Sequence, residues 1–352
     1  MKALKLKSRR LLRVLSGVLL LAAAASNFNC ADNSGHTESA SGRPAVSGSE
    51  DLHKPVTAEN PALKDTVLKY KLPRQIRYSA FAVKGRSPMA KLDSTYGTDG
   101  ARLILALNRL DEADIRRADT LIVPDTLTNL LSYCPYPYVI EKAREVPKLL
   151  LISRRIQAFA AYENGVLVKW GPTSTGRKAK PTPEGLFSAN WKSRKTTSTI
   201  DSSWILPYYF NFQNKEGVAL HQFSMPGYPA SHACVRLLEN DARWLYYWAE
   251  QWILSNAGKI EAYGTPIVVF DDYRFGKRKP WKNLLENPDA ITVSDKDIQD
   301  LMDKYLPTIL ERSEKRKEVL AAREAEKMEK TEMMEKTEKI PDSEKVQVSE
   351  QN

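Results

Sequence analysis

Cys234 follows two histidines and precedes an arginine in a chain that is otherwise poor in histidine. The segment that begins ten residues after His221 covers residues 231–236 and reads SHACVR. Only four histidines occur in the 352 residues, and the other two, His36 and His53, fall in a polar N-terminal stretch. Every histidine expected in a folded region is therefore close to Cys234 in the sequence.

Cys234 has the neighbours that a nucleophilic cysteine requires. Because the thiolate is the nucleophile, a catalytic cysteine needs an imidazole that takes its proton, and His221 and His232 both qualify. If residues 231–237 are extended, His232, Cys234 and Arg236 share one face, since side chains alternate along a strand. Arg236 would add a fixed positive charge that binds carboxylates. These residue types predict an acyl-transfer site.

Two other interpretations of Cys234 are open. Free cysteines are among the most buried residue types, so Cys234 could be a small buried hydrophobe. His221, His232 and Cys234 are also residue types that bind zinc, but no other histidine or paired cysteine supplies a fourth ligand at the usual spacing. The neighbouring residues favour the nucleophile over both alternatives.

Around these residues the sequence resembles the L,D-transpeptidase family with the YkuD-type catalytic domain. The signature of that family is a histidine in a strand, then Ser-His-Gly-Cys, a small apolar residue, and Arg or Asn. Other family-like segments occur in the same order: the opening strands at 148–152 and 157–165, STG at 174–176, PTPEGLF at 181–187, and the following helix at 239–246. The resemblance covers residues 146–270.

The resemblance implies a reaction and assigns roles in it. Cys234 would be the nucleophile that a peptidoglycan stem peptide acylates, with release of the terminal D-alanine. His221 would be the general base, oriented by the backbone carbonyl of Gln222. An amine acceptor would then give a cross-link, and water would give carboxypeptidase activity. No cofactor and no metal are implied.

The same resemblance places four further residues in the site. His232 and the backbone amides around Ala233 and Cys234 would line the oxyanion hole, which stabilises the tetrahedral intermediate. Ser231 and Arg236 would contact the substrate. The expected partners are peptidoglycan stem peptides and glycan, whereas protein partners are unknown.

Two features depart from the family pattern. Ala233 replaces the usual glycine, and its Cβ penalises the positive φ that the oxyanion hole would need. The loop from Gln222 to Ser231 is shorter than usual, and Pro226, Gly227 and Pro229 predict a compact, rigid turn there. The first departure bears on the geometry of the oxyanion hole and not on the thiol chemistry, and the second predicts a different access to the cleft.

Two alternative functions are open. A sortase-like transpeptidase would also use Cys, His and Arg to join proteins to the cell wall, but it separates these residues over different strands. A non-catalytic peptidoglycan-binding lipoprotein would explain Ala233 as the mark of a degenerate site. The intact Cys234 and His221 argue against this second alternative.

The N-terminus has the composition of a secretory signal. Six basic residues and no acidic residue precede position 14, and an apolar run at 14–25 is too short to span a bilayer. Cys30 follows and resembles the lipidation site of a lipoprotein, which predicts a membrane anchor and a location in the periplasm or cell envelope. Without these six charges the net charge of +10 falls to +4, which gives no case for a nucleic-acid partner.

We predict a mainly β fold with packed helices, organised in five segments. These are a signal peptide at 1–30, a flexible linker at 31–70, a small α/β module resembling LysM at 71–145, a YkuD-like β-sandwich at 146–272, and a charged helical tail, partly disordered, at 273–352. The LysM resemblance rests mainly on LNRL and ADTLIVP in residues 107–124, and the alternative is a packing module without glycan affinity. Cys134 is expected to be buried and reduced, because pairing with Cys234 would block the nucleophile.

Local patterns predict several individual elements. Asn164-Gly165 predicts a hairpin, and further strands are expected at 185–188, 208–212, 217–222 and 265–270. A helix capped by Asn240 or Asp241 is expected to bury one face as far as Ile253. Ser294 with Asp297 has the pattern of a capping box. The aromatic residues at 204–212 are expected either to line a peptide groove or to be core.

Overall fold

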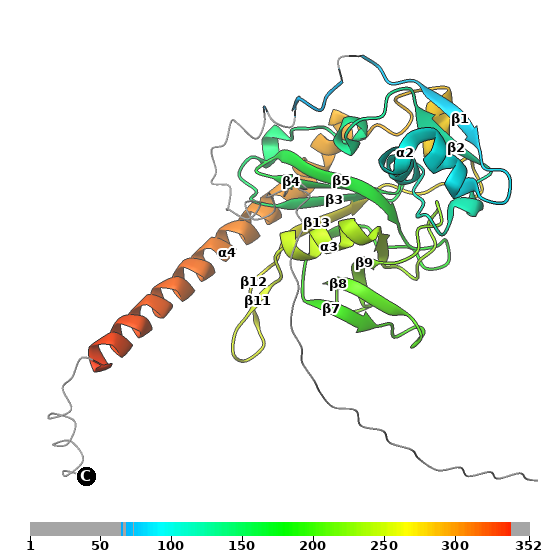
Figure 1. The fold of residues 1–352 in the computed structure, drawn as a ribbon. Helices are drawn as coiled ribbons and strands as arrows, with labels where there is room; N and C mark the ends of the chain where they lie inside the picture. Colours follow the sequence, from blue (N-terminus) through cyan, green and yellow to red (C-terminus); the bar gives the residue numbers. More distant parts are fainter. Residues whose placement is uncertain (1–64, 66–67, 73, 339–352) are drawn as a thin grey trace, which may run out of the picture. The chain divides into compact units, whose positions relative to one another are not determined.

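The computed structural model describes Asp65, residues 68–72 and residues 74–338 (Figure 1). The predicted signal peptide, the lipidation site Cys30 and most of the predicted linker lie outside these residues. Among the described helices, none combines the length and the apolar composition needed to cross a membrane.

Nine of the described strands form one mixed sheet between residues 149 and 270. Their order across the sheet is β6-β13-β3-β4-β5-β10-β9-β8-β7. Only the pairs β13/β3 and β10/β9 are parallel. The strands are β3 (Leu149–Ser153), β4 (Ala158–Glu163), β5 (Val166–Ser174), β6 (Gly185–Ser188), β7 (Lys192–Thr197), β8 (Ile205–Gln213), β9 (Val218–Gln222), β10 (Val235–Leu237) and β13 (Pro266–Phe270).

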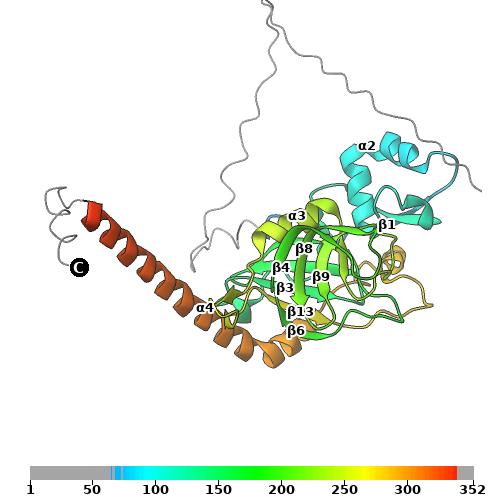
Figure 2. The ribbon, with the colours of Figure 1, turned by 90° about the horizontal axis from the view of Figure 1, so that it is seen from below.

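The sheet bends so that its two halves pack face to face. β8 and β9 lie over β3 and β4 in Figure 2, and the two groups form separate layers in Figure 1. Leu150 and Ile152 of β3 pack in a core with Phe210 and Leu220 from the other half. Alternate side chains of β3 and β4 fill a second core on the outer face. The mainly β class is confirmed, and one continuous curled sheet makes both layers of the sandwich.

The predicted hairpin at Asn164-Gly165 joins β4 to β5. Both residues have positive φ, 48° and 75°, as a two-residue turn of type I′ requires. A Cβ on Gly165 would lie 2.5 Å from the carbonyl oxygen of Ile140. Glycine is therefore needed here both for its φ and for the close approach of a second backbone.

The strands expected at 185–188, 208–212, 217–222 and 265–270 all occur, at β6, β8, β9 and β13. The helix prediction is wrong at both ends, because α3 spans Glu239–Trp248 with Leu238 as N-cap. Beyond Trp248 the chain is extended and forms β11 (Ile253–Leu254), which pairs with β12 (Ile260–Ala262). Tertiary hydrogen bonds replace helical ones there: the ammonium of Lys192 donates to the carbonyl of Tyr246 (2.8 Å), and the amide of Trp252 donates to Asn190 (3.0 Å).

An N-terminal module, residues 78–124, precedes the sheet. β1 (Tyr78–Ala82) and β2 (Thr120–Pro124) form an antiparallel pair, joined through α2 (Pro88–Leu107) and the short helix η1 (Ile115–Arg117). Gly97 breaks α2 with φ 73° and ψ 163°, so the order is strand, helix, helix, strand. The module has its own apolar core around Leu92, Ile104 and Leu121. Its relation to LysM and its glycan affinity stay predictions.

Short 3-10 helices connect these parts: η2 (Leu130–Tyr133), η3 (Glu141–Ala143) and η4 (Pro280–Leu285). Cys134, just after η2, is a free thiol packed against the outer core, and burial raises its pKa.

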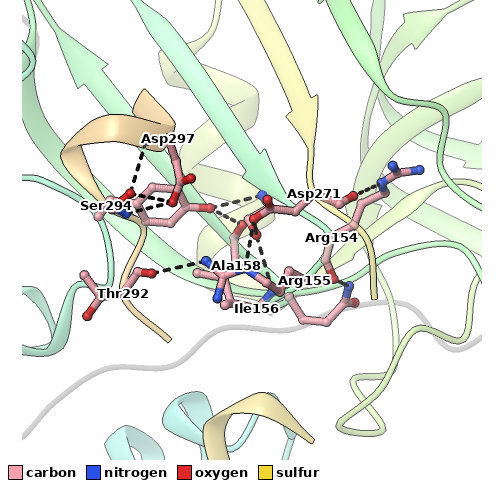
Figure 3. Close-up of polar contacts among 11 residues, drawn as sticks. Arg154, Arg155, Ile156, Ala158, Asp271, Thr292, Ser294 and Asp297 are labelled. Atoms are coloured by element: carbon pink, nitrogen blue, oxygen red, sulfur yellow. Dashed lines mark hydrogen bonds and ion pairs between the residues drawn. The ribbon is translucent and has the colours of Figure 1, made fainter. Parts of the chain in front are cut away.

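The chain after β13 is fixed to the β3–β4 turn by two arginines (Figure 3). Arg154 Nε donates to the backbone oxygen of Asp271 (2.6 Å), and Arg155 Nε contacts the Asp271 carboxylate (3.2 Å). Arg155 Nη2 also donates to the carbonyl of Thr292 (3.1 Å). These contacts place the start of the last helix beside the outer core.

The last helix, α4 (Asp295–Glu338), begins with the predicted capping box. The hydroxyl of Ser294 donates to the Asp297 carboxylate (2.8 Å) and accepts from the Asp297 amide (3.1 Å), as Figure 3 shows. Ile298, Met302 and Ile309 are buried against the outer core, whereas every residue from 321 to 335 is exposed. The first turns of α4 therefore belong to the folded body.

Ile309→Ala is expected to lower the free energy of unfolding by about 2–5 kcal/mol, because Ile309 is fully buried. Leu320→Ala on the same helix is the control, since Leu320 is 47% exposed and its loss is expected to change stability by less than about 0.5 kcal/mol. Urea unfolding of both variants checks this. Equal effects would mean that α4 does not pack as described.

Candidate active site

The parallel pairing of β9 with β10 brings the two parts of the SHACVR region together. His221 in β9 lies opposite Arg236 in β10, and Leu220 lies opposite Val235. Cys234 immediately precedes β10. Because β10 pairs with β9, the thiol lies beside the strand that carries His221. Two neighbouring strands therefore position both groups.

His221, Ser231, His232, Cys234 and Arg236 all line one cleft of about 370 Å³. The extended conformation predicted for residues 231–237 is wrong, although these five residues share one cleft. Only residues 235–237 form a strand. Ala233 has φ 85°, so the chain turns sharply before Cys234 instead of alternating along an extended strand.

The aromatic residues before His221 divide between the two roles considered. Phe210 and Phe212 belong to the inner core. Trp204 and Tyr209 line the cleft. Tyr209 stacks on His221 with ring centroids 6.4 Å apart.

His221 is buried, with 4% of its surface exposed. Its Nδ1 lies 2.9 Å from the backbone oxygen of Gln222. Since a carbonyl only accepts, Nδ1 carries the proton of the neutral ring, and Nε2 is left with a free lone pair. Burial lowers the pKa of His221 to about 4, against the opposing effect of the Gln222 bond. The imidazole is therefore neutral at pH 7 and can accept a proton at Nε2.

Cys234 is also neutral in this structure. Its thiol donates to the carbonyl oxygen of Gly217 at 3.7 Å. Burial raises the pKa of Cys234, and the charge of Arg236 only partly opposes this. The resting site thus contains a thiol and a neutral imidazole instead of an ion pair.

The STG segment at the end of β5 holds the loop that leads to Cys234. The hydroxyl of Ser174 donates to the carbonyl of Tyr228 (2.7 Å) and accepts from the amide of Ala230 (3.2 Å). The amide of Ser231 donates to the carbonyl of Thr175 (3.1 Å). Polar residues at the end of β5 therefore hold this loop through hydrogen bonds to the backbone of the loop.

Thr182 and Gln157 complete this support, although neither was predicted as a site residue from the sequence. Thr182 Oγ1 donates to the carbonyl of Ala233 (2.7 Å) and accepts from the amide of Gly176 (2.9 Å). The side-chain amide of Gln157 makes two 2.8 Å bonds to Thr175. The available signal was their position in the family-like segments 157–165 and 181–187.

Gly176 allows the tight packing of this support. A Cβ at this position would lie 2.2 Å from the carbonyl oxygen of Lys180 and 2.5 Å from the amide of Thr182. No side chain fits there, so the STG motif requires its glycine for packing.

Arg236 keeps its charge available to the cleft. Its guanidinium lies 4.6 Å from the centroid of the Phe223 ring, and Nη1 approaches the carbonyl and hydroxyl of Ser224 at 3.4 Å. Burial lowers its pKa, but a guanidinium remains protonated at pH 7. Across residues 65–338, no carboxylate that the structure describes forms an ion pair with it.

His232 packs against Trp204 with ring centroids 5.6 Å apart. Its Nδ1 is buried and has no hydrogen-bond partner among the described residues. Burial lowers its pKa, and the charges of Arg177, Arg236 and Lys180 add to the effect. Within the part of the chain that the structure describes, no three His, Cys, Asp or Glu side chains gather as metal ligands.

A larger hollow, of about 630 Å³, lies beside the end of α3, β11 and α4. It shares only Trp252 with the cleft, and no Cys, Ser or His is among the described residues that line it. Its cations already have partners, such as Arg316 with Glu250 (2.7 Å) and Lys148 with Glu250 (2.9 Å). The smaller cleft is therefore the candidate active site.

The family model of the L,D-transpeptidase catalytic domain, YkuD, matches residues 147–269. This segment is a YkuD-type domain. It contains all nine strands of the large sheet except the last residue of β13, together with α3 and the whole cleft.

Solved structures of L,D-transpeptidases resemble the chain in sequence at a low level. The enzyme of Mycobacterium smegmatis is 21% identical over 36% of this chain and 59% of its own, with a TM-score of 0.30. L,D-transpeptidase 1 of Mycobacterium tuberculosis is 24% identical over 35% and 60%, with a TM-score of 0.26. The structure from Xylanimonas cellulosilytica is 23% identical over 56% and 100%, with a TM-score of 0.34. This chain thus spans about three fifths of the two mycobacterial structures. Curated proteins give no match.

The neutral His221 of the YkuD-type domain predicts a loss of stability in acid. The unfolded chain takes up a proton on this imidazole below pH 6.5, whereas the folded protein does so only near pH 4, so acid favours unfolding. Over this interval His221 is expected to remove about 3 kcal/mol of stability. Unfolding free energies at pH 7 and pH 4 check this. Between pH 7 and pH 4 the unfolding free energy of His221→Gln should fall by about 3 kcal/mol less than that of the parent protein. An equal fall in both proteins would contradict the prediction.

Ala233→Gly is expected to stabilise the protein by roughly 1 kcal/mol. A residue with a Cβ at φ 85° is strained by about 1–3 kcal/mol, and the greater entropy of glycine in the unfolded chain offsets part of the relief. Thermal unfolding of the variant checks this. Ala189→Gly is the control, since Ala189 is buried without a positive φ, and this change should destabilise.

Proposed function

We propose that this protein is a cysteine-dependent L,D-transpeptidase that acts on peptidoglycan stem peptides. One observation carries the proposal: within the YkuD-type domain, Cys234 faces the same cleft as a neutral His221 whose Nδ1 is held by the carbonyl of Gln222. A thiol beside an imidazole that is oriented by a third group is the arrangement of an activated nucleophile.

The first half-reaction starts with a turn of the Cys234 thiol from Gly217 toward His221. Nε2 of His221 takes the thiol proton, and the sulfur attacks the carbonyl carbon of the bond that precedes the terminal D-alanine. The proton on His221 then passes to the leaving amine. A thioester to Cys234 forms, and free D-alanine leaves.

The remaining site residues act on the substrate. Backbone amides around Ala233 and Cys234, beside His232, form the oxyanion hole, and the turn at Ala233 sets their direction. The charge of Arg236 binds a carboxylate of the stem peptide. Ser231 borders the same cleft, and its hydroxyl donates to the carbonyl of Cys234, which stiffens the loop.

The second half-reaction transfers the acyl group from Cys234. An amine acceptor gives a cross-link, and water gives a free carboxylate. We place this reaction in the cell envelope, with a secreted protein anchored through a lipid on Cys30 and an N-terminal module that binds glycan. The basic N-terminus followed by an apolar run and Cys30 supports that location.

The test is intact-protein mass spectrometry after incubation with a disaccharide-tetrapeptide. We expect an adduct of the mass of the acylated enzyme without D-alanine, because the thioester forms on Cys234. Cys234→Ala should form none, and Cys134→Ala should react like the parent protein, since Cys134 packs against the outer core away from the cleft.

A folded parent protein that forms no adduct would contradict the proposal and leave glycan binding as the function. Cleavage of a sorting-signal peptide with the stem peptide left intact would favour the sortase-like alternative.

A further inference from the structure

The N-terminal module contacts the loop that connects β9 to β10, residues 223–234. Leu110 forms an isolated antiparallel bridge with Pro226. The amide of Asp111 donates to the carbonyl of Met225 (3.1 Å), and the amide of Met225 donates to Asp111 Oδ2 (2.8 Å). Two reciprocal hydrogen bonds therefore fix one loop residue to the module.

The loop is also packed closely against the module. Met225 is fully buried. Gly227 has φ 76°, and a Cβ there would lie 3.1 Å from Leu110 Cδ2 and 3.3 Å from the carbonyl oxygen of Asn108. The contact thus depends on a glycine that lets two backbones approach.

The residues next to Met225 touch the reactive groups. The ring of Phe223 meets the His221 ring edge to face, with centroids 6.0 Å apart, and lies under the guanidinium of Arg236. The carbonyl of Ser224 faces Arg236 Nη1 at 3.4 Å. A shift at Met225 therefore reaches both His221 and Arg236 through one or two residues.

A second residue of the module acts on Arg236 through charge. Asp114 is buried and pairs with Arg117, and one of its carboxylate oxygens has no hydrogen-bond partner among the described residues. Its negative charge favours the charged form of Arg236, in opposition to the larger effect of burial. The module thus contributes both geometry and charge to the cleft.

We propose that Asp111 is a positioning residue, through which the N-terminal module holds Phe223 and Ser224 against His221 and Arg236. The module is then a structural part of the active site and not only a separate binding unit. The catalytic consequence rests on the proposed transpeptidase function, whereas the effect on the environment of His221 does not.

Asp111→Asn tests the proposal in the full chain. The carboxylate accepts from two amides, Asp114 at Oδ1 and Met225 at Oδ2, and asparagine can accept only one of them. Asp125→Asn is the matched control, because it removes a carboxylate directly after β2 of the module, one that pairs with Arg74 and not with the loop.

The first readout is the titration of His221 by NMR with labelled histidine. Four histidines give four signals, and His221→Gln assigns the relevant one. We expect a pKa of about 4 in the parent protein and in Asp125→Asn, and a rise toward 6.5 in Asp111→Asn, because a loosened Phe223 admits water to the ring. The second readout, the acylation rate of Cys234, should fall by roughly ten- to a hundredfold.

Gly227→Ala disturbs the same contact from the loop side and replaces Asp111→Asn if that variant does not fold. An unchanged His221 pKa in a folded variant of either kind overturns the inference. If the parent protein forms no acyl adduct but the His221 pKa shifts as expected, the proposed function fails and the positioning role of Asp111 stands.

Discussion

The short return from β9 to β10 is the constraint on which the site depends. Two parallel strands must become neighbours although only twelve residues separate Gln222 from Val235. Such a loop cannot satisfy its own backbone groups, so other segments bond to it. Ser174, Thr175 and Thr182 do so from one side, and Leu110 and Asp111 do so from the other. The position of the thiol follows from these external contacts.

Burial determines the electrostatic character of the site. It lowers the pKa of His221 and raises that of Cys234, so both groups are uncharged at pH 7. Burying an ion pair in this cleft would cost more desolvation free energy than burying the neutral thiol and imidazole. The guanidinium of Arg236 is the exception, because it stays charged although the residue is buried in the lining of the cleft.

Two of the described segments outside the YkuD-type domain pack onto it. The module at 78–124 reaches the active-site loop, and the first turns of α4 cover the outer core with Ile298, Met302 and Ile309. The other half of the sheet buries one face of β3 and β4 and these added segments bury the other, which suits the nearly continuous apolar sequence of both strands. Parts of the chain that the family model does not cover therefore contact the domain in two places, at the β9–β10 loop and at the outer core.

The sequence by itself determined the features that depend on neighbouring residues. Asn164-Gly165 specified a turn with two positive φ values, Ser294 with Asp297 specified a cap, and SHACVR after His221 indicated residues that line one cleft, because each is a local pattern. Only the tertiary structure decided where α3 ends, since Lys192 of β7 binds the carbonyl of Tyr246 and Asn190, between β6 and β7, binds the amide of Trp252 beyond the helix. The same holds for the supporting roles of Gln157, Thr182 and Asp111. Their partners Thr175, Ala233 and Met225 lie 18, 51 and 114 positions away in the sequence, so spacing alone carries no signal of these contacts.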